Sequence, residues 1–450
     1  MEDKLIGSFV KDMASYGDAD AIVFSGTTYS YRDLLGLVED WQSFLRANKV
    51  EPGEVIALES AYSPASCAAM LALIEIGAII VPLTTLPAAK RQEFHEVGQV
   101  EVVITVTDAG REFERTGRSA DHQLYQELPG AGLVLFSSGT TGRSKASVLD
   151  FQRLLARYDN GNGQKRPRRT LAFLSLDHIG GINTLFHTFS QGGAVITVPE
   201  RTPVAVFAAV EEHRVSILPT TPTFLTMVLI SGALDRHDTS SLELITYGTE
   251  PMPTRTLSRM VEMLPEVRFK QTYGLSELGI LPTKSRSDDT LWVKLGSSGF
   301  EHKIIDNVLW IRSEMAMLGY LNAPAPFDAD GFFNTQDVVE VDGDWVCILG
   351  RQSEIINVGG EKVYPSEVES VVLEISNIAD ATVSGRANRV TGMVVSVVVK
   401  LVEPEDIASV RRRIREHCSQ RLEAFKVPAS ISISSDDQHS DRFKKLRNNT

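Results

Sequence analysis

The stretch LFSSGTTGRSK, residues 135–145, places several hydroxyl side chains, two glycines and a lysine in one short loop. It follows the apolar run Gly132-Leu133-Val134 directly. Glycines let the backbone approach an anion closely, successive N–H groups and hydroxyls donate to its oxygens, and the lysine adds a positive charge. The composition predicts a phosphate-binding loop and therefore a nucleotide ligand. The alternative is an ordinary turn between two strands, since serine, threonine and glycine favour turns.

This loop does not follow the Walker A pattern, because Arg143 and Ser144 separate Gly142 from Lys145. Kinase and GTPase functions are therefore less favoured. The loop instead resembles the Ser/Thr/Gly-rich loop of the adenylate-forming superfamily, which comprises acyl-CoA synthetases, nonribosomal adenylation domains and luciferases. The resemblance assigns nucleotide binding to Ser137, Ser138, Gly139, Thr140, Thr141 and Lys145.

A second segment, QTYGLSE at residues 271–277, resembles the Tyr-Gly-x-Thr/Ser-Glu motif of the same superfamily. The planar ring of Tyr273 can pack against adenine, and the Ser276 hydroxyl can donate to the α-phosphate. The Glu277 carboxylate, with Thr140 of the loop, is expected to hold Mg²⁺, a hard cation that binds oxygen ligands. Alternatively, Tyr273 is a core aromatic residue and Glu277 a solvated residue at the start of a helix.

The segment TYGTEP at residues 246–251 stands where the superfamily has its Gly-rich segment beside adenine. The apolar run at residues 242–245 predicts a β-strand that leads to it. Ligands in open parallel sheets bind at such carboxyl ends of strands. The resemblance therefore adds Gly248, Thr249, Glu250 and Thr272 to the expected nucleotide-binding residues.

The third and most specific signature is FNTQD at residues 333–337, followed by WVCILGRQSEIINVGGEKVYPSEVE at residues 345–369. In order and spacing these segments resemble the superfamily motifs T-x-D, G-R-x-x-D-x-I and G-x-x-x-x-P-x-E-[IV]-E. The resemblance implies that Asp337 accepts hydrogen bonds from both ribose hydroxyls, a task suited to a carboxylate. Arg351 would add a ribose or phosphate contact through its planar guanidinium. Gln336 stands where the superfamily has glycine.

The segment LSLDHIGGIN, residues 174–183, is expected to lie on the acyl side of the site. The resemblance implies that His178 lies beside the carboxylate being activated, as a gate or orienting group, with Gly180 next to the substrate. A structural histidine is the alternative. Aligned on the glycines, His178 and not Asp177 takes the pocket position, so Asp177 is expected to cap the helix that follows. This favours a fatty or aromatic acid over an amino acid.

The C-terminal segment SDRFKKLR, residues 440–447, resembles the G-K-I-x-R motif whose lysine bridges the substrate carboxylate and AMP. Matching the last arginine places Lys444 in the catalytic position. Phe443 and Lys445 depart from the motif, so the register between Lys444 and Lys445 stays open. A disordered basic tail is the alternative. In the same superfamily the small domain then rotates and opens a route for a thiol, here past Gly359 and Gly360.

The chain length of 450 residues predicts more than one hydrophobic core. The resemblance implies an α/β fold with a large N-terminal domain, residues 1–350, built of parallel β-sheets with helices. A small C-terminal α+β domain, residues 353–450, would rotate about a hinge near Ser353. The run at residues 67–83 supports this fold, because it predicts a small-residue helix, a glycine stop and a buried strand, which is a parallel α/β unit.

The composition is 43% hydrophobic and 23% charged, with a net charge of −13, which argues against broad binding to nucleic acid or anionic lipid. The three cysteines lack metal-ligand spacing, so a reducing compartment, the cytoplasm, is expected. The longest apolar stretch, residues 68–83, contains Glu75, Gly77 and Pro82, which argues against a membrane span.

The chemistry follows from charge, since ATP and a carboxylate are both anionic and need local cations to approach each other. Mg²⁺, Lys145 and Lys444 would provide them, so that the acid attacks the α-phosphorus, releases pyrophosphate and forms an acyl-adenylate. Coenzyme A (CoA) would then take the acyl group and release AMP. Two alternatives remain: transfer to the phosphopantetheine arm of an acyl or peptidyl carrier protein, and a non-catalytic nucleotide-binding homologue.

Overall fold

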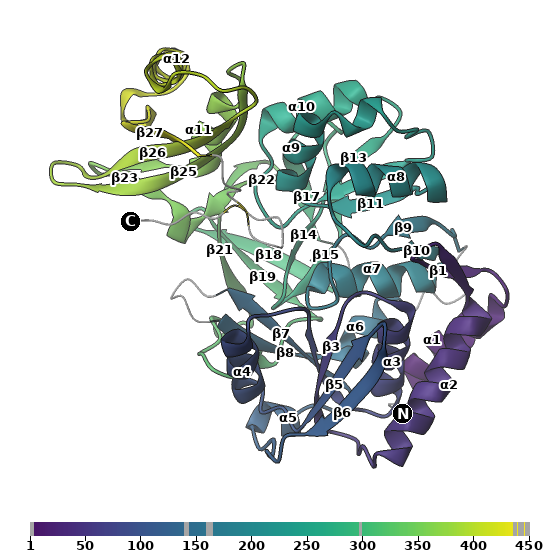
Figure 1. The fold of residues 1–450 in the computed structure, drawn as a ribbon. Coiled ribbons are helices and arrows are strands. Elements are labelled where there is room, and N and C mark those ends of the chain that lie inside the picture. Colours follow the sequence, from purple (N-terminus) through teal and green to yellow (C-terminus); the bar gives the residue numbers. More distant parts are fainter. Residues whose placement is uncertain are drawn as a thin grey trace.

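The computed structural model describes residues 4–138, 144–158, 165–296, 299–434, 439 and 445, apart from the side chains of Lys4 and Ser138. Within these ranges, two seven-stranded sheets, a six-stranded sheet and their helices form the larger part of the molecule, and a five-stranded sheet with two helices forms a smaller part (Figure 1). The α/β class and the division into a large and a small part are as predicted.

The first sheet is parallel except for its edge strand β2. Its strand order is β13 (Arg268–Gln271), β12 (Leu244–Tyr247), β11 (Ile217–Thr220), β9 (Arg169–Leu171), β10 (Ala194–Ile196), β1 (Asp20–Phe24) and β2 (Thr27–Ser30). One face packs against α8 (Pro203–His213), α9 (Pro222–Ser231) and α10 (Thr254–Met263), whose apolar residues share a single core with it. The other face carries α7 (Ile179–Ser190), which packs on β9 and β10.

The second sheet has a parallel centre and antiparallel edges. Its strand order is β20 (Gly319–Tyr320), β8 (Ser144–Asp150), β7 (Gly132–Ser138), β4 (Ile79–Leu83), β3 (Val55–Ser60), β5 (Val102–Thr107) and β6 (Gly110–Arg115). The helix α3 (Pro64–Glu75), a left-handed Gly77 and the buried β4 form the predicted parallel unit. Their apolar residues explain why this unit lies at the centre of the molecule.

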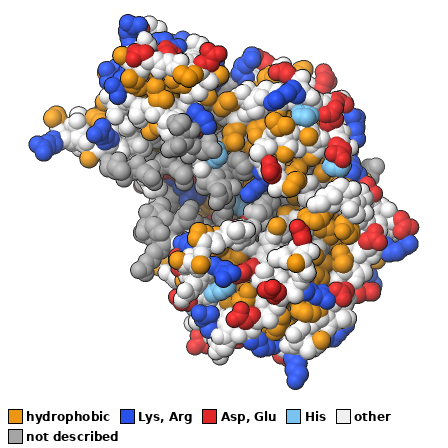
Figure 2. All heavy atoms as spheres, in the orientation of Figure 1, with side chains coloured by type: hydrophobic (Ala, Val, Ile, Leu, Met, Phe, Trp, Pro, Cys, Tyr) orange, Lys and Arg blue, Asp and Glu red, His pale blue; other side chains and the backbone are white. Residues whose placement is uncertain are grey.

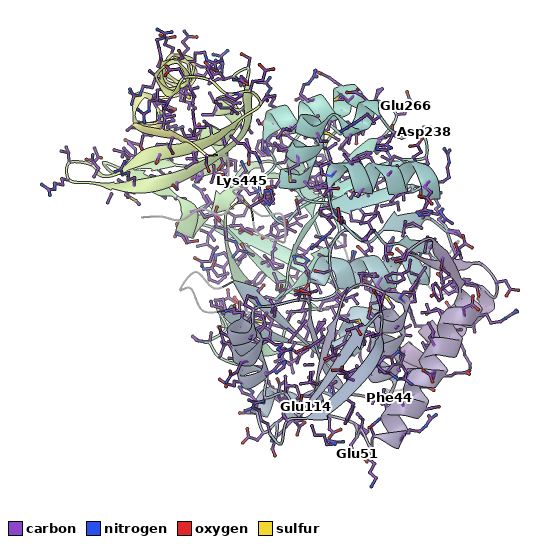
Figure 3. The ribbon with its side chains drawn as sticks, in the orientation of Figure 1. Phe44, Glu51, Glu114, Asp238, Glu266 and Lys445 are labelled. Atoms are coloured by element: carbon purple, nitrogen blue, oxygen red, sulfur yellow. The ribbon has the colours of Figure 1, made fainter. Side chains whose placement is uncertain are left out.

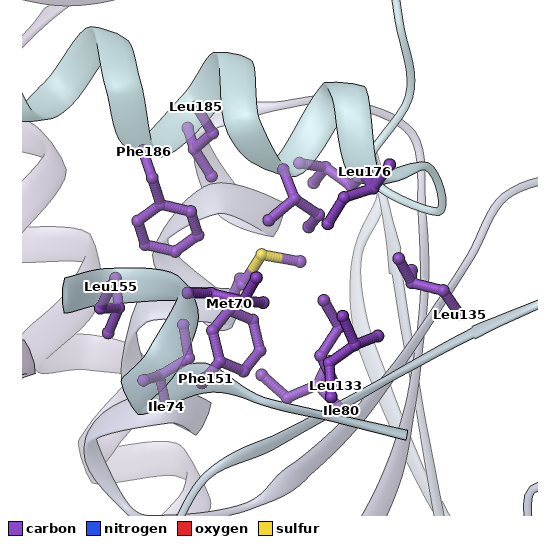
Figure 4. Close-up of a cluster of buried hydrophobic side chains, with 14 of the residues drawn as sticks. Met70, Ile74, Ile80, Leu133, Leu135, Phe151, Leu155, Leu176, Leu185 and Phe186 are labelled. Atoms are coloured by element: carbon purple, nitrogen blue, oxygen red, sulfur yellow. The ribbon is translucent and has the colours of Figure 1, made fainter. Parts of the chain in front are cut away.

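Helix α7 joins the two sheets, because its apolar side chains belong to the same core as α3 and the second sheet. Figure 4 shows Phe186 of α7 above Met70 of α3 and Phe151, with Leu133 of β7 below them. The remaining helices of this part are α1 (Lys4–Ser15), α2 (Tyr31–Ala47), α4 (Ala88–Val97), α5 (Gln123–Gln126) and α6 (Phe151–Ala156). The position of α7 therefore fixes the segment before it, residues 174–178, between the two sheets.

The third sheet of the larger part is entirely antiparallel, a feature that the expected parallel architecture did not include. Its strand order is β16 (Thr283–Ser285), β17 (Trp292–Leu295), β22 (Trp345–Arg351), β21 (Phe333–Asp342), β19 (Val308–Ser313) and β18 (Phe300–Ile305). A short hairpin of β14 (Tyr273–Leu275) and β15 (Gly279–Leu281) connects the first sheet to this one.

The smaller part has a hydrophobic cluster of its own, built from residues between Ile356 and Ile431. Its elements are β23 (Ile356–Val358), β24 (Glu361–Val363), α11 (Pro365–Val372), β25 (Ile378–Asn388), β26 (Gly392–Leu401), α12 (Ile407–Ser419) and β27 (Ser430–Ile433). It meets the larger part where α11 packs on β22 and α9 packs on β25. Whether the chain divides into independent domains at residues 350–353 stays a prediction.

On the side shown in Figure 2, acidic and basic side chains of the described residues are interspersed. Among the helices of the described ranges, none combines the length and the apolarity that a membrane crossing requires.

Candidate active site

The predicted adenine-side segments meet at the carboxyl ends of β12 and β13. Tyr247 pairs with Gln271 in the parallel ladder, and the Thr272 amide donates to the Tyr247 carbonyl at 2.8 Å. A Cβ atom at Gly248 would stand 2.6 Å from the Thr272 carbonyl oxygen. Glycine is therefore required at position 248, because any side chain would collide with the neighbouring backbone.

The residue after Gly248 is held in an unusual backbone conformation, and the next residue is held by a hydrogen bond. Thr249 has φ of +76°, a left-handed value that costs energy for a residue with a Cβ atom. The Glu250 carboxylate accepts the backbone N–H of Thr223 at 2.8 Å, at the start of α9. Strained residues of this kind persist where the surroundings impose them, and they cluster at binding sites.

Asp337 and Arg351 face each other as a registered pair of the antiparallel strands β21 and β22. The Arg351 Nε atom lies 3.4 Å from Asp337 Oδ1, and the Tyr273 hydroxyl donates to Oδ2. Only 6% of Asp337 is exposed, and this burial raises the pKa of its carboxyl group against the opposing effects of Arg351 and Tyr273. Three predicted nucleotide-binding side chains thus form one contact cluster.

Gln336, which replaces a superfamily glycine before Asp337, has φ of +63°. Its amide donates to Asn334 Oδ1 at 3.0 Å, and the Asp337 amide donates to the Thr335 hydroxyl at 3.0 Å. Thr335 in turn donates to the Leu309 carbonyl at 2.7 Å. These bonds hold the backbone of β21 in the irregularity that aims the Asp337 carboxylate, so the glutamine adopts the strained conformation.

Glu277 lies in the turn between β14 and β15, so its proposed place at a helix start is wrong. Its Oε1 atom accepts the Tyr320 hydroxyl at 2.7 Å and the Ser137 hydroxyl at 3.5 Å. The Lys145 ammonium lies 5.1 Å from the centre of the Tyr320 ring. Oε2 accepts no hydrogen bond from the described residues, which leaves one carboxylate oxygen for a hard cation. Ser276 occupies the same turn.

Tyr320 is the functional candidate that the sequence analysis missed. It belongs to the two-residue strand β20, which pairs with β8 beside the predicted phosphate loop. Its hydroxyl positions Glu277 and its ring faces Lys145, so it links a carboxylate and a cation from distant segments. The only signal in the sequence is one aromatic residue in a Gly-Tyr pair, and such pairs are common.

The predicted phosphate loop connects β7 and β8, which pair in antiparallel register up to Ser138 and Ser144. Ser137 and Lys145 are directly opposite each other on these strands. Gly139, Thr140, Thr141 and the Ser138 side chain lie outside the described residues. The segment that connects these two strands is also the predicted phosphate-binding loop. The two interpretations, a connection between strands and a phosphate-binding loop, therefore do not exclude each other.

On the acyl side, the predicted helix cap at Asp177 is wrong. His178 is the N-cap of α7, and its Nδ1 atom accepts the Gly180 N–H at 2.9 Å. Asp177 is buried and accepts the hydroxyls of Ser175 at 2.5 Å and Thr84 at 3.2 Å. Because Nδ1 is an acceptor, the other ring nitrogen of a neutral His178 carries the proton and can donate.

The glycine pair after His178 is explained by packing. A Cβ atom at Gly181 would stand 2.0 Å from the Ser175 carbonyl oxygen, and one at Gly180 would stand 2.4 Å from Leu174 Cδ1. The first turn of α7 therefore folds tightly onto the segment before it. This close approach holds His178 and Gly180 beside the strand ends of the first sheet.

Lys445 lies at the boundary between the two parts of the molecule (Figure 3). Lys444 lies outside the described residues. The Lys445 ammonium is 3.2 Å from Asp380 Oδ1 and 3.6 Å from Glu369 Oε2, and it donates to the Ala381 carbonyl. The Lys445 amide donates to Glu250 at 3.3 Å. The ammonium of Lys445 is thus bound within the small part in this conformation, and the choice between Lys444 and Lys445 as the catalytic lysine stays a prediction.

Gly359 and Gly360 form the turn between β23 and β24, and both have the positive φ values, +63° and +98°, that favour glycine. The Gly359 amide donates to the Thr391 carbonyl and the Gly360 amide to Asn357 Oδ1, each at 2.9 Å. The turn is exposed at the edge of the small sheet. Its assignment to a thiol route stays a prediction.

A two-part α/β fold with these polar residues at the strand ends defines a nucleotide-binding enzyme scaffold. The AMP-binding enzyme model matches residues 9–131 and 130–321, and the model of its C-terminal domain matches residues 367–444. The chain belongs to the AMP-binding enzyme family, which confirms the predicted superfamily.

The chain is 27% identical to the indoleacetate–CoA ligase of Aromatoleum aromaticum, over 91% of this chain and 90% of the relative. It is 30% identical to the 4-coumarate–CoA ligase-like protein 2 of Arabidopsis thaliana, over 56% of this chain and 49% of the relative. Its fold is similar to that of the anthranilate CoA ligase AuaEII in complex with anthranoyl-AMP. That match has a TM-score of 0.82 and 19% identity, and covers 97% of this chain and 95% of that structure. These relatives support the predicted acid–thiol ligase activity.

Proposed function

We propose that this chain is an AMP-forming acid–CoA ligase that activates an aromatic carboxylic acid as its acyl-adenylate. The observation that carries the proposal is the buried contact of Asp337 with Arg351 and Tyr273 at the strand ends. A carboxylate in this position suits the two hydroxyls of a ribose. The family and the two ligases to which the chain is similar support the same activity.

In this proposal ATP lies along the carboxyl ends of β12 and β13. Asp337 and Arg351 hold the ribose, and Gly248, Thr249 and Thr272 border the base. The ring of Tyr273 is 7% exposed and its hydroxyl is directed to Asp337, so it contributes both a flat surface and the orientation of that carboxylate. Ser276 and the loop at residues 137–145 face the phosphates.

Mg²⁺ fits this arrangement, because Glu277 keeps one carboxylate oxygen free of hydrogen bonds from the described residues. Glu277 and Thr140 would hold the ion, which would reduce the negative charge of the phosphates. Lys145 would add a positive charge on the same side, and Tyr320 would keep Glu277 and Lys145 apart so that they do not neutralise each other.

The reaction then proceeds by two displacements. Lys444 and Lys145 offset the repulsion while a carboxylate oxygen bonds to the α-phosphorus and the bond to pyrophosphate breaks. The neutral His178, oriented by its bond to Gly180, stands beside the acid. After rotation of the small part, the CoA sulfur bonds to the acyl carbon, its proton passes to solvent, and AMP leaves with the electron pair of the broken C–O bond.

An aromatic acid is favoured over an amino acid for two reasons. Asp177 already accepts hydrogen bonds from Ser175 and Thr84, so its carboxylate is not presented to a substrate ammonium. Of the relatives reported above, one is named an indoleacetate–CoA ligase and the other is named as similar to 4-coumarate–CoA ligases. Transfer to a carrier protein remains the second candidate acceptor reaction. A cytoplasmic location is proposed from the three free, buried cysteines.

The test is pyrophosphate release over a set of aromatic, fatty and amino acids, each with ATP and Mg²⁺ and with or without CoA. We expect aromatic acids to release pyrophosphate and CoA to give a thioester with AMP. Adenylate formation without thioester would favour a carrier-protein acceptor. If no acid exchanges labelled pyrophosphate into ATP although ATP binds, the chain is a non-catalytic homologue. Asp337→Ala, which should weaken ATP binding, is the matched control.

A further inference from the structure

The carboxylate of Glu250 binds backbone amides from two distant segments of the chain. Its Oε1 atom accepts the Thr223 N–H at 2.8 Å, in the first turn of α9, where the amides have no partner within the helix. Its Oε2 atom accepts the Lys445 N–H at 3.3 Å, 195 positions later in the sequence. One carboxylate therefore connects a helix of the larger part with a residue near the C-terminus.

The backbone around Glu250 is fixed by the larger part. A Cβ atom at Gly248 would collide with the neighbouring backbone, and Thr249 has a left-handed conformation. On the other side, Pro251 lies 3.9 Å from the place of a Cβ atom at Gly350, near the end of β22. The carboxylate is thus held in position by its own surroundings, independently of Lys445.

The side chain of Lys445, in contrast, binds to the small part. Its ammonium is 3.2 Å from Asp380 Oδ1 and 3.6 Å from Glu369 Oε2, and it donates to the Ala381 carbonyl. These partners belong to α11 and β25, which share one core. A rotation of the small part as one body would keep these contacts and would carry Lys445 away from Glu250.

The contact lies where the two parts of the molecule touch, because α9 packs on β25 there. Capping of α9 alone would use one oxygen of Glu250, whereas the second oxygen accepts the Lys445 amide. The sequence analysis expected Glu250 beside the nucleotide. A carboxylate close to the phosphates of ATP would repel them, and both oxygens are bound to backbone amides instead.

We propose that Glu250 is a positioning residue for adenylate formation, which holds the segment with the predicted catalytic lysine against the larger part by binding the Lys445 N–H. Glu250 would not touch the substrate. Its bond to Lys445 would form for the first half-reaction and break before the thiol reacts, since Lys445 moves with the small part and Glu250 does not. This inference rests on the proposed function and adds a contact that favours one of its two conformations.

The first test compares the two half-reactions, with the acid that the pyrophosphate screen selects. Glu250→Ala removes both bonds, and we expect kcat for pyrophosphate release to fall about tenfold or more, because a hydrogen bond to a charged group is lost. KM for ATP should stay within about twofold, and thioester formation from preformed acyl-adenylate should not slow. Glu250→Gln should have a smaller effect, because the amide still accepts one N–H. Glu266→Ala removes an exposed carboxylate and should change neither half-reaction (Figure 3).

The second test is hydrogen exchange of the Lys445 amide in the protein without substrates. We expect faster exchange of this amide in Glu250→Ala than in the wild type, with β25 amides unchanged. Equal slowing of both half-reactions would indicate a merely structural role, and a raised KM for ATP with unchanged kcat would indicate a nucleotide contact. Either result, or unchanged exchange of the Lys445 amide, would overturn the inference and leave the ligase activity intact. Absence of pyrophosphate release by the wild type from any acid would instead remove the proposed function.

Discussion

Replacement of Lys445 by methionine tests the ionic anchor of the C-terminal tail. The side chain of Lys445 is 5% exposed and that of Glu369 is 2% exposed, and their charged atoms are 3.6 Å apart. Glu369 Oε1 accepts the Val383 N–H at 2.9 Å, so this carboxylate is held inside the small part when the lysine is removed. Asp380, 14% exposed, loses the same partner at 3.2 Å.

Removing one partner of a buried ion pair costs about 3–5 kcal/mol, because the other charge stays buried without compensation. Here Asp380 is 14% exposed and Glu369 keeps the Val383 N–H, so we expect the low end, about 3 kcal/mol. Neutralising the acids as well should recover most of this loss. The triple variant Lys445→Met, Glu369→Gln, Asp380→Asn is therefore expected to be more stable than the single variant.

Hydrogen exchange of the β25 amides is the suitable assay, because the four tryptophans, at positions 41, 292, 310 and 345, lie outside the small hydrophobic cluster and would not report on it. Lys362→Met removes an exposed lysine of the same part and should change stability by less than about 0.5 kcal/mol. The prediction is refuted if the β25 amides of Lys445→Met exchange as slowly as those of the wild type. It is also refuted if the triple variant is the least stable of the three proteins.

Lys444→Ala should abolish adenylate formation from acid and ATP while leaving thioester formation from preformed acyl-adenylate largely intact; the same loss from Lys445→Ala alone would shift the register by one residue. Gln336→Gly should raise the free energy of unfolding by about 1 kcal/mol, since it relieves a left-handed backbone, and a measured decrease would contradict this. Burial raises the pKa of Asp337, so adenosine should bind more weakly as the pH falls through that raised pKa, whereas Asp337→Asn should bind weakly at every pH. The same shift means that ionised Asp337 costs stability at neutral pH, so Asp337→Asn without nucleotide should melt above the wild type; an unchanged melting temperature would count against its buried charge.

The elements that the sequence predicted well are those whose defining residues lie within one continuous segment of the chain. The helix, glycine and strand predicted at residues 67–83 follow from local composition. Asp337 and Arg351 end up opposite each other because the motifs that contain them become adjacent antiparallel strands. The ordered motifs therefore identified the two segments that bring Asp337 and Arg351 together, although the role of each residue stays a prediction.

The features that were missed depend on contacts between distant segments. Tyr320 reaches Glu277 only because a two-residue strand joins β8. The sequence analysis assigned the helix cap to Asp177, whereas His178 is the N-cap of α7. A difference of one residue in where the helix begins decides which of the two side chains caps it.

The tight start of α7 also limits how this enzyme could be redesigned or could diversify. Because the Ser175 carbonyl occupies the space beside Gly181, a larger residue there would have to displace main chain and not merely a neighbouring side chain. Directed evolution toward new acids would therefore find few viable variants at this point. Useful variation should accumulate instead at the partly exposed positions of β11 and β12, where a new side chain is not forced to displace main chain.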